Sequence, residues 1–116
     1  MIHLKRAYEQ SSGEDGVRIL VERPWPRGLT KAKAALDLWI KDAAPSRYLR
    51  KWFGHDPARW KQFRQRYWKE LKDKKDVDVL RREAREGRVT FIYAAHDEEH
   101  NGALALKEFI EQRGKE

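Results

Sequence analysis

The chain has 116 residues, of which 40% are hydrophobic and 39% charged, and this length suits one compact domain over residues 1–116. It carries 26 Lys and Arg against 19 Asp and Glu, and the resulting formal charge of +7 favours anionic partners without specifying a fold. No run of 18 apolar residues occurs, so no membrane partner is expected. The lack of Cys excludes disulfides and thiol nucleophiles and predicts a soluble, cytoplasmic protein.

Two short strands are predicted near the N-terminus. Residues 2–7 alternate weakly between apolar and polar side chains, and β-branched residues dominate 17–22. The intervening stretch 9–16 is rich in turn formers. The sequence leaves open whether these two strands pair in a parallel or an antiparallel direction, although the connection between them is short for a parallel crossover.

The middle of the chain predicts two short helices. Two prolines and a glycine within 24–28 stop the second strand. Thr30 is a plausible N-cap for a helix from Lys31 to about Trp39, and Ser46 is a plausible N-cap for a helix over 47–53.

The strongest helix signal covers 57–71, where Asp56 is suited to cap the helix and Pro57 to occupy its first position. Four large side chains fall on one stripe of this helix: Trp60, Phe63, Tyr67 and Leu71. A second helix is predicted over 78–86.

Residues 89–95 (VTFIYAA) form an apolar run typical of a central strand covered on both faces. A final helix is predicted from about Glu98 to Arg113, followed by a frayed tail at 114–116. The order of elements predicts a small α/β domain with a short, mostly parallel sheet of about three strands flanked by helices.

Polar segments follow two of the predicted strands. In open α/β sheets, ligands bind beyond the carboxyl ends of the strands, so these segments would form one cleft if the strands are parallel neighbours. The candidate ligand-binding residues are Arg23, Trp25, Arg27, Lys31, Asp97 and Asn101. Guanidinium groups on a proline-restricted backbone can clasp a carboxylate or phosphate, which predicts a small anionic ligand. Alternatively, Trp25 closes the edge of the core and the arginines pair with Glu22, Asp37 or Asp42.

Three residues are candidates for proton transfer: His55, Asp56 and His100. A carboxylate beside an imidazole can tune it for acid–base work, but Asp56 as a helix cap is the favoured alternative. The string HDEEH at 96–100 is superficially similar to the zinc motif H-E-x-x-H. That motif needs both histidines on one helix, whereas this strand ends near Ala95. Neither a metal nor a cofactor is expected, and whether any reaction is catalysed stays open.

A nucleic-acid-binding module is the main alternative, because residues 57–88 carry 12 basic and six acidic side chains. Trp68 is expected to project from the apolar stripe between Arg64 and Lys72, where phosphate contacts and stacking would combine. Acidic residues at helical spacing favour a plain solvated face instead. A third hypothesis is a subunit of a protein assembly with exposed Trp residues, and the oligomeric state is not predicted.

Four uncommon strings occur in order: DGVRILVERPWPRGLTK (15–31), LWIKDAAPS (38–46), LRKWFGHDPARW (49–60) and YAAHDEEHN (93–101). On these strings the chain resembles the YeaO-like group within domain-of-unknown-function family 488, from about Leu4 to Leu106. The resemblance implies a fold and a region for the site, but no reaction.

The resemblance implies that the group's signature residues correspond to the following positions of this chain: Arg6, Asp15, Gly16, Arg18, Arg27, Gly28, Lys31, Trp39, Pro45, Ser46, Arg50, Phe53, His55, Asp56, Phe63, Tyr67, Asp97 and His100. The chain departs from the group's pattern at Glu22 (usually Asp), Pro24 (usually Leu) and His96 (commonly Lys). Longer members of the family carry Cys at the end of the last strand, where this chain has Ala94-Ala95. Chemistry that depends on that thiol is therefore not expected.

Overall fold

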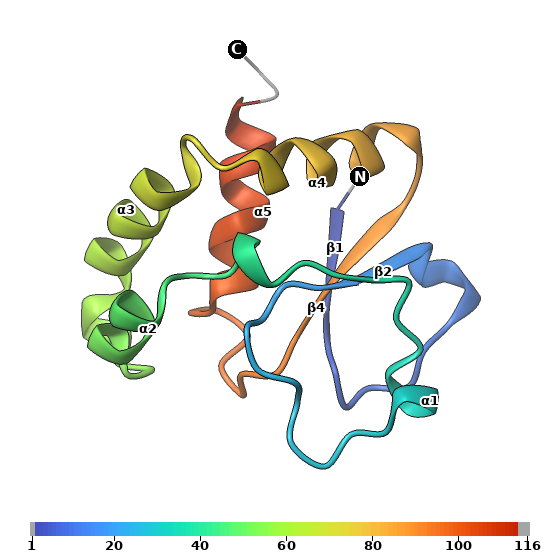
Figure 1. The fold of residues 1–116 in the computed structure, drawn as a ribbon. Coiled ribbons are helices and arrows are strands. Elements are labelled where there is room, and N and C mark those ends of the chain that lie inside the picture. Colours follow the sequence, from blue (N-terminus) through green and yellow to red (C-terminus); the bar gives the residue numbers. More distant parts are fainter. Residues whose placement is uncertain (1, 114–116) are drawn as a thin grey trace.

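A parallel sheet organises the fold (Figure 1). The structure is a computed structural model that describes residues 2–113, and within them four strands lie in the order β1-β4-β2-β3. The strands are β1 (Ile2–Arg6), β2 (Val17–Leu20), β3 (Leu38–Trp39) and β4 (Val89–Tyr93). The α-helices are α1 (Lys31–Ala34), α2 (Arg47–Phe53), α3 (Trp60–Leu71), α4 (Lys75–Glu86) and α5 (Gly102–Arg113). Short 3-10 helices occur at η1 (Gly13–Asp15), η2 (Lys41–Ala43) and η3 (Pro57–Arg59).

The predicted α/β class and parallel sheet are confirmed, with four strands rather than about three among the described residues. β1 and β2 do not pair with each other, because β4 lies between them. Ile2 and Val17 both stand in register with Val89. All five residues of β4 are buried, as expected for a central strand covered on both faces.

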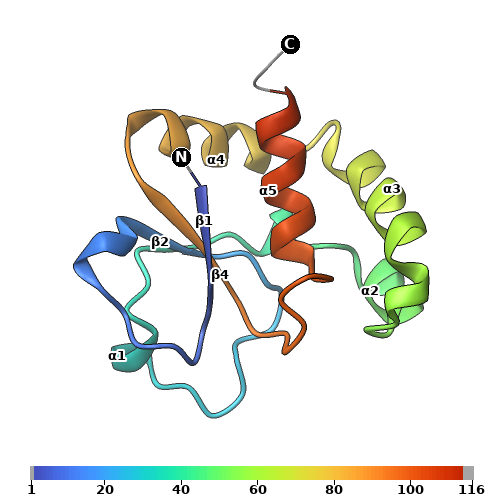
Figure 2. The same ribbon diagram turned by 180° about the vertical axis from the view of Figure 1, so that it is seen from behind.

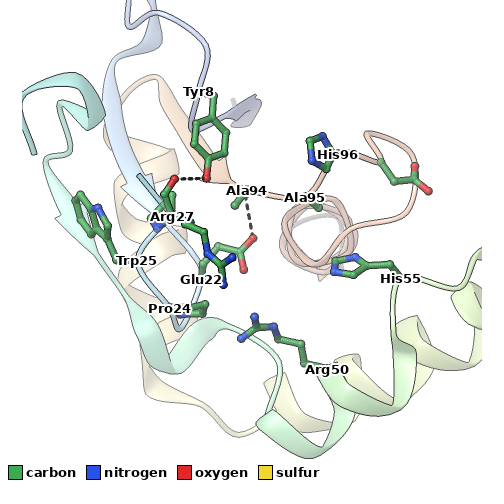
Figure 3. Close-up of a pocket in the computed structure, with 12 residues that line it drawn as sticks. Tyr8, Glu22, Pro24, Trp25, Arg27, Arg50, His55, Ala94, Ala95 and His96 are labelled. Atoms are coloured by element: carbon green, nitrogen blue, oxygen red, sulfur yellow. Dashed lines mark hydrogen bonds between the residues drawn. The ribbon is translucent and has the colours of Figure 1, made fainter. Parts of the chain in front are cut away.

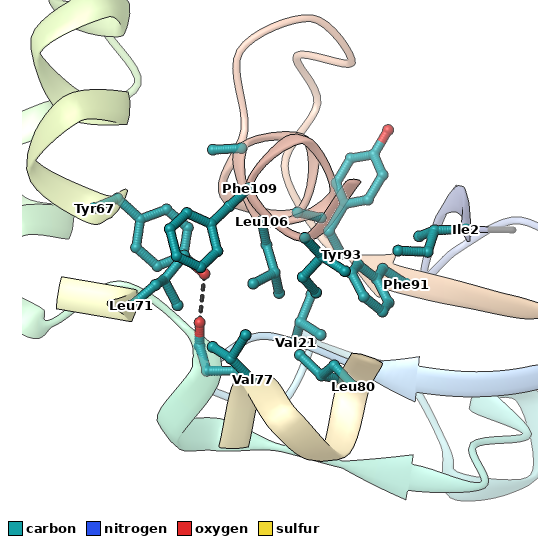
Figure 4. Close-up of a cluster of buried hydrophobic side chains, with 14 of the residues drawn as sticks. Ile2, Val21, Tyr67, Leu71, Val77, Leu80, Phe91, Tyr93, Leu106 and Phe109 are labelled. Atoms are coloured by element: carbon teal, nitrogen blue, oxygen red, sulfur yellow. Dashed lines mark hydrogen bonds between the residues drawn. The ribbon is translucent and has the colours of Figure 1, made fainter. Parts of the chain in front are cut away.

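The two faces of the sheet are covered unequally. Ile19 and Phe91 face the main core, to which α2, α3 and α5 contribute Leu49, Phe63 and Leu106. Figure 4 shows Phe91 and Leu106 in this core together with Leu80 of α4. Figure 2 shows α5 against this sheet from the far side, in agreement with its contacts to β1 and β4. The opposite face has a smaller cluster, covered by side chains of the segment between β2 and β3.

A buried ion-pair cluster holds the second face. Asp15 accepts from Arg18 at 2.5 Å and from Lys5 at 3.1 Å, and Arg18 also donates to the Ala34 carbonyl at 2.9 Å. Burial by itself raises the pKa of Asp15, but hydrogen bonds from the Ser12 N–H, Lys5 and Arg18 outweigh it. The pKa of Asp15 therefore lies below its ordinary value, and the cluster ties η1 and α1 to the sheet.

The predicted helix from Lys31 to Trp39 is wrong beyond Ala34. Ala35 adopts a left-handed conformation with φ 46°, which ends α1. The Asp37 carboxylate then accepts from the Arg18 N–H at 2.8 Å, and the chain pairs with β2 as the unpredicted strand β3. Hydrogen bonds to a strand distant in sequence thus override the local helix signal.

The other helices follow their local signals more closely. Helix α2 has the predicted bounds and the predicted Ser46 cap, and the segment 57–71 forms η3 followed by α3. Helix α4 begins at Lys75, three residues before its predicted start. Helix α5 begins at Gly102 rather than near Glu98. The predicted frayed tail at 114–116 lies outside the described residues.

A buried hydrogen bond anchors η2 to α3. The hydroxyl of Tyr67, which is fully buried, donates to the Ala43 carbonyl (Figure 4). Burial raises the pKa of Tyr67 well above its ordinary value, so this hydroxyl stays a donor.

None of the helices within residues 2–113 combines the length and the apolar character that crossing a bilayer requires.

Candidate functional site

A cavity of about 590 Å³ opens beyond the carboxyl ends of β2 and β4 (Figure 3). Its wall includes Tyr8 after β1, most of the segment 22–27 after β2, two side chains from or next to α2, and residues 94–97 after β4. Because β2 and β4 are parallel neighbours, their end segments lie together at one edge of the sheet.

Glu22 is the acidic group on the β2 side of the cavity. Its Oε1 accepts a hydrogen bond from the Ala94 N–H at 3.1 Å, which joins the ends of β2 and β4. Burial raises the pKa of Glu22 above its ordinary value. The Ala94 hydrogen bond and the charges of Arg50 and His55 oppose that shift without cancelling it.

Arg27 and Arg50 supply positive charge to the cavity, and Figure 3 shows both side chains pointing into it. Among the described residues, neither guanidinium has a hydrogen-bond partner or forms an ion pair. The Arg27 loop is held by its backbone, since the Tyr8 hydroxyl donates to the Arg27 carbonyl at 2.9 Å.

His55 borders the cavity through an unusual backbone conformation. Its φ of 57° is left-handed, directly after the left-handed Gly54 that ends α2. For a residue with a Cβ this conformation costs about 1 kcal/mol. The imidazole of His55 follows this turn and borders the cavity (Figure 3).

Asp56 does not pair with His55. Its Oδ1 accepts from the Ala58 N–H at 3.0 Å as the N-cap of η3, and its Oδ2 lies 3.7 Å from the Arg59 guanidinium. The alternative interpretation of Asp56 as a helix cap is confirmed. The Asp56 carboxylate therefore does not serve as the partner of the His55 imidazole.

Arg23 and Lys31 do not line the cavity. The Arg23 guanidinium donates to the Pro45 carbonyl at 2.9 Å and lies 3.5 Å from Asp42, one of the pairings considered from the sequence. Lys31 is the first residue of α1 and is absent from the cavity lining. Consecutive side chains of the extended segment after β2 diverge, which separates Arg23 from Glu22.

Trp25 borders the cavity but is engaged elsewhere. Its indole N–H donates to the Leu29 carbonyl at 2.6 Å, and its ring meets Trp39 edge-on at 5.4 Å. The hydrogen bond and the Trp39 contact hold this indole against its own loop at the border of the cavity.

Asp97 lines the far side of the cavity, with its carboxylate used within its own turn. It accepts from the N–H groups of Glu99 and His100 and lies 2.9 Å from His100 Nδ1. The hydrogen bond from the Glu99 N–H, followed by that of His100, lowers the pKa of Asp97. This turn is the reason why α5 begins later than predicted.

His100 and Asn101 lie outside the lining of the cavity. The His100 ring packs edge-on against Trp60 at 5.5 Å. Asn101 is buried and accepts from the Leu104 N–H at 2.8 Å, so it caps α5. Both side chains order the turn between β4 and α5.

Arg50 and Tyr8 line the cavity, although reasoning from the residues singled out neither. Arg50 lies within a correctly predicted helix, but no local pattern distinguishes it from the other exposed basic residues there, and only the family signature includes it. Glu22 and His96, two positions at which the chain departs from the group's pattern, also line the cavity. His96 Nδ1 lies 3.3 Å from the Arg6 guanidinium, which also donates to the Ala95 carbonyl.

The prediction that Trp68 projects away from the core is wrong. Its indole N–H donates to the Ala105 carbonyl at 3.0 Å, and its ring packs against Phe109 at 5.8 Å. Arg64 lies over the Trp68 ring and 3.4 Å from Glu108, while Lys72 is exposed. The stacking platform required by the nucleic-acid hypothesis is therefore packed against α5.

Within residues 2–113, no three His, Asp or Glu side chains gather closely enough to hold a metal ion. The histidines of the HDEEH string diverge, since His96 contacts Arg6 while His100 contacts Trp60.

The fold and site define an α/β protein with a cavity at the carboxyl ends of parallel strands. The model of the inactive DUF488-N3 subclade matches residues 1–116, so the chain belongs to this subclade, and its resemblance to the YeaO-like group is confirmed. It is 37% identical over 114 residues to the uncharacterized protein YeaO of Escherichia coli (strain K12), covering 94% of this chain and 96% of that protein. It is 35% identical over 112 residues to the uncharacterized protein Rv3073c of Mycobacterium tuberculosis (strain ATCC 25618 / H37Rv), covering 97% and 95%. No solved structure matches the chain.

Proposed function

We propose that this protein binds a small anionic ligand, bearing a phosphate or carboxylate, in the cavity beyond β2 and β4, and that it does so without chemical turnover. The observation that carries the proposal is the pair of unpartnered guanidinium groups, Arg27 and Arg50, on one cavity. Guanidinium groups match carboxylate and phosphate oxygens bidentately, so an anion would supply the partners that these side chains lack within the described chain.

The dimensions of the cavity support a small ligand. Its volume of about 590 Å³ falls within the range of pockets that hold small molecules and cofactors. Its backbone is also stiffened, by Pro24 and Pro26 on one side and by the Glu22–Ala94 hydrogen bond on the other. A preformed wall reduces the entropy lost on binding.

Two observations favour binding over catalysis. The family description is of an inactive subclade. Ala94 and Ala95 border the cavity at the position where the family resemblance implies a Cys in longer members, so no thiol nucleophile is available there. The location in the cytoplasm stays a prediction from the cysteine-free sequence.

Calorimetric titration with inorganic phosphate and pyrophosphate tests the proposal. Each of Arg27→Ala and Arg50→Ala should weaken binding about tenfold or more, because each removes a charge-assisted hydrogen-bonding group. Arg47→Ala is the matched control, since Arg47 is exposed on the same helix as Arg50 and does not line the cavity.

The proposal fails if the wild-type protein binds neither anion at millimolar concentration. It also fails if Arg47→Ala weakens binding as much as the two cavity variants do, because the effect would then come from net charge alone.

A further inference from the structure

We infer that Glu22 makes the cavity selective for anions that bring their own hydrogen-bond donor, such as hydrogen phosphate or a phosphate ester with a neighbouring hydroxyl. Anions that only accept hydrogen bonds would be rejected. This inference rests on the proposed anion site and assigns its specificity to one carboxylate.

The Glu22 carboxylate has unused acceptor capacity on the cavity side. Oε1 accepts from the Ala94 N–H at 3.1 Å. Within the described residues Oε2 has no hydrogen-bond partner, and it is not closed off from solvent. Because a carboxylate can accept about four hydrogen bonds, a ligand donor can be accommodated there.

Glu22 is not neutralised by the arginines around the cavity. The Arg50 charge acts on Glu22, but neither Arg27 nor Arg50 lies within ion-pair distance of it in the described chain. The cavity therefore presents two guanidinium donors and one carboxylate acceptor to the same ligand (Figure 3).

This combination discriminates between anions of the same charge. An anion held by Arg27 and Arg50 comes close to Glu22, where like charges repel and two sets of lone pairs face each other. A proton on the ligand removes the conflict, because an O–H then donates to the carboxylate in a charge-assisted hydrogen bond. An anion without a proton cannot donate this hydrogen bond, so its repulsion by Glu22 is not offset.

Sulfate and phosphate are the probes for this inference, since both are tetrahedral oxyanions. At neutral pH phosphate keeps at least one O–H, whereas sulfate has none. Wild-type protein should bind phosphate about tenfold to a hundredfold more tightly than sulfate in calorimetric titrations at one ionic strength.

The variant Glu22→Gln should reduce that preference to about threefold or less. Gln has nearly the same shape and its carbonyl oxygen can still accept from the Ala94 N–H, while its NH₂ group can donate to sulfate. The main change should therefore be a gain in sulfate affinity. Glu99→Gln, an exposed carboxylate that does not line the cavity, removes the same charge and should keep the wild-type preference.

The outcomes separate this inference from the proposed function. If wild-type protein binds neither anion, the proposed site fails and the inference with it. If it binds both with equal affinity, the anion site stands and the inference is overturned. Unchanged selectivity in Glu22→Gln overturns it as well. The wild-type comparison needs no variant, so it decides the matter even if Glu22→Gln does not fold.

Discussion

Removing the hydroxyl of Tyr67 tests the connection between η2 and α3. Tyr67 is fully buried, and its O–H donates to the Ala43 carbonyl, itself in a fully buried residue. Tyr67→Phe keeps the ring but leaves that carbonyl without its donor, which costs about 1–3 kcal/mol. With an m-value of about 1.5 kcal/mol per M, the urea midpoint should fall by about 0.7–2 M at unchanged m.

Tyr48→Phe is the matched control for this measurement. Tyr48 is 76% exposed, so losing its hydroxyl should change the free energy of unfolding by less than about 0.5 kcal/mol. Equal midpoints for Tyr67→Phe and the wild-type protein would refute the reasoning, since the buried carbonyl would then have found another partner.

The pKa of Tyr67 adds a check on the same pair of proteins. Because burial raises this pKa well above 10.0, the unfolded state releases its proton first as the pH rises. The advantage of the wild-type protein over Tyr67→Phe should therefore be complete below pH 10.0 and shrink above it. A difference that grows above that pH would show that the hydroxyl is not buried.

Two further predictions concern carboxylates and are measured by urea unfolding as a function of pH. Asp15→Asn should cost about 3–5 kcal/mol near neutral pH, because it leaves the buried Arg18 charge without its carboxylate partner. The pKa of Asp15 is lowered, so this loss should diminish as the pH falls below 3.8, and a constant loss would contradict the assignment. The pKa of Glu22 is raised, so its contribution to stability is present below pH 4.5 and is lost as the pH rises through the folded-state value. Glu22→Gln should thus gain stability relative to wild type from pH 4.5 upward, and a flat difference would contradict the shift.

Local signals predicted the elements that depend on neighbouring residues. The Ser46 cap and the left-handed Gly54 bound α2, and the stripe containing Phe63 and Tyr67 formed the buried side of α3. These signals are readable because a cap or a helix face involves residues only a few positions apart. The apolar run of β4 likewise predicted a strand buried on both faces.

Elements that depend on distant partners were not predicted. The end of α1 and the existence of β3 follow from hydrogen bonds between Asp37 and Arg18. The packing of Trp68 follows from the Ala105 carbonyl on α5. No pattern within a single segment carries information about such partners, so propensity and periodicity alone pointed elsewhere.

The candidate site likewise has features that the sequence predicts and features that depend on distant partners. From the sequence alone come the edge of the sheet, the guanidinium of Arg27 and the absence of a thiol. The tertiary structure decided which charges remain unpaired at that edge, because it turned Arg23 toward Pro45, used Asp56 and Asn101 as helix caps, and brought Arg50 to Glu22. The sequence determines which residues are charged. Whether a charged side chain is available to bind a ligand depends on the partners that folding brings within hydrogen-bonding distance of it.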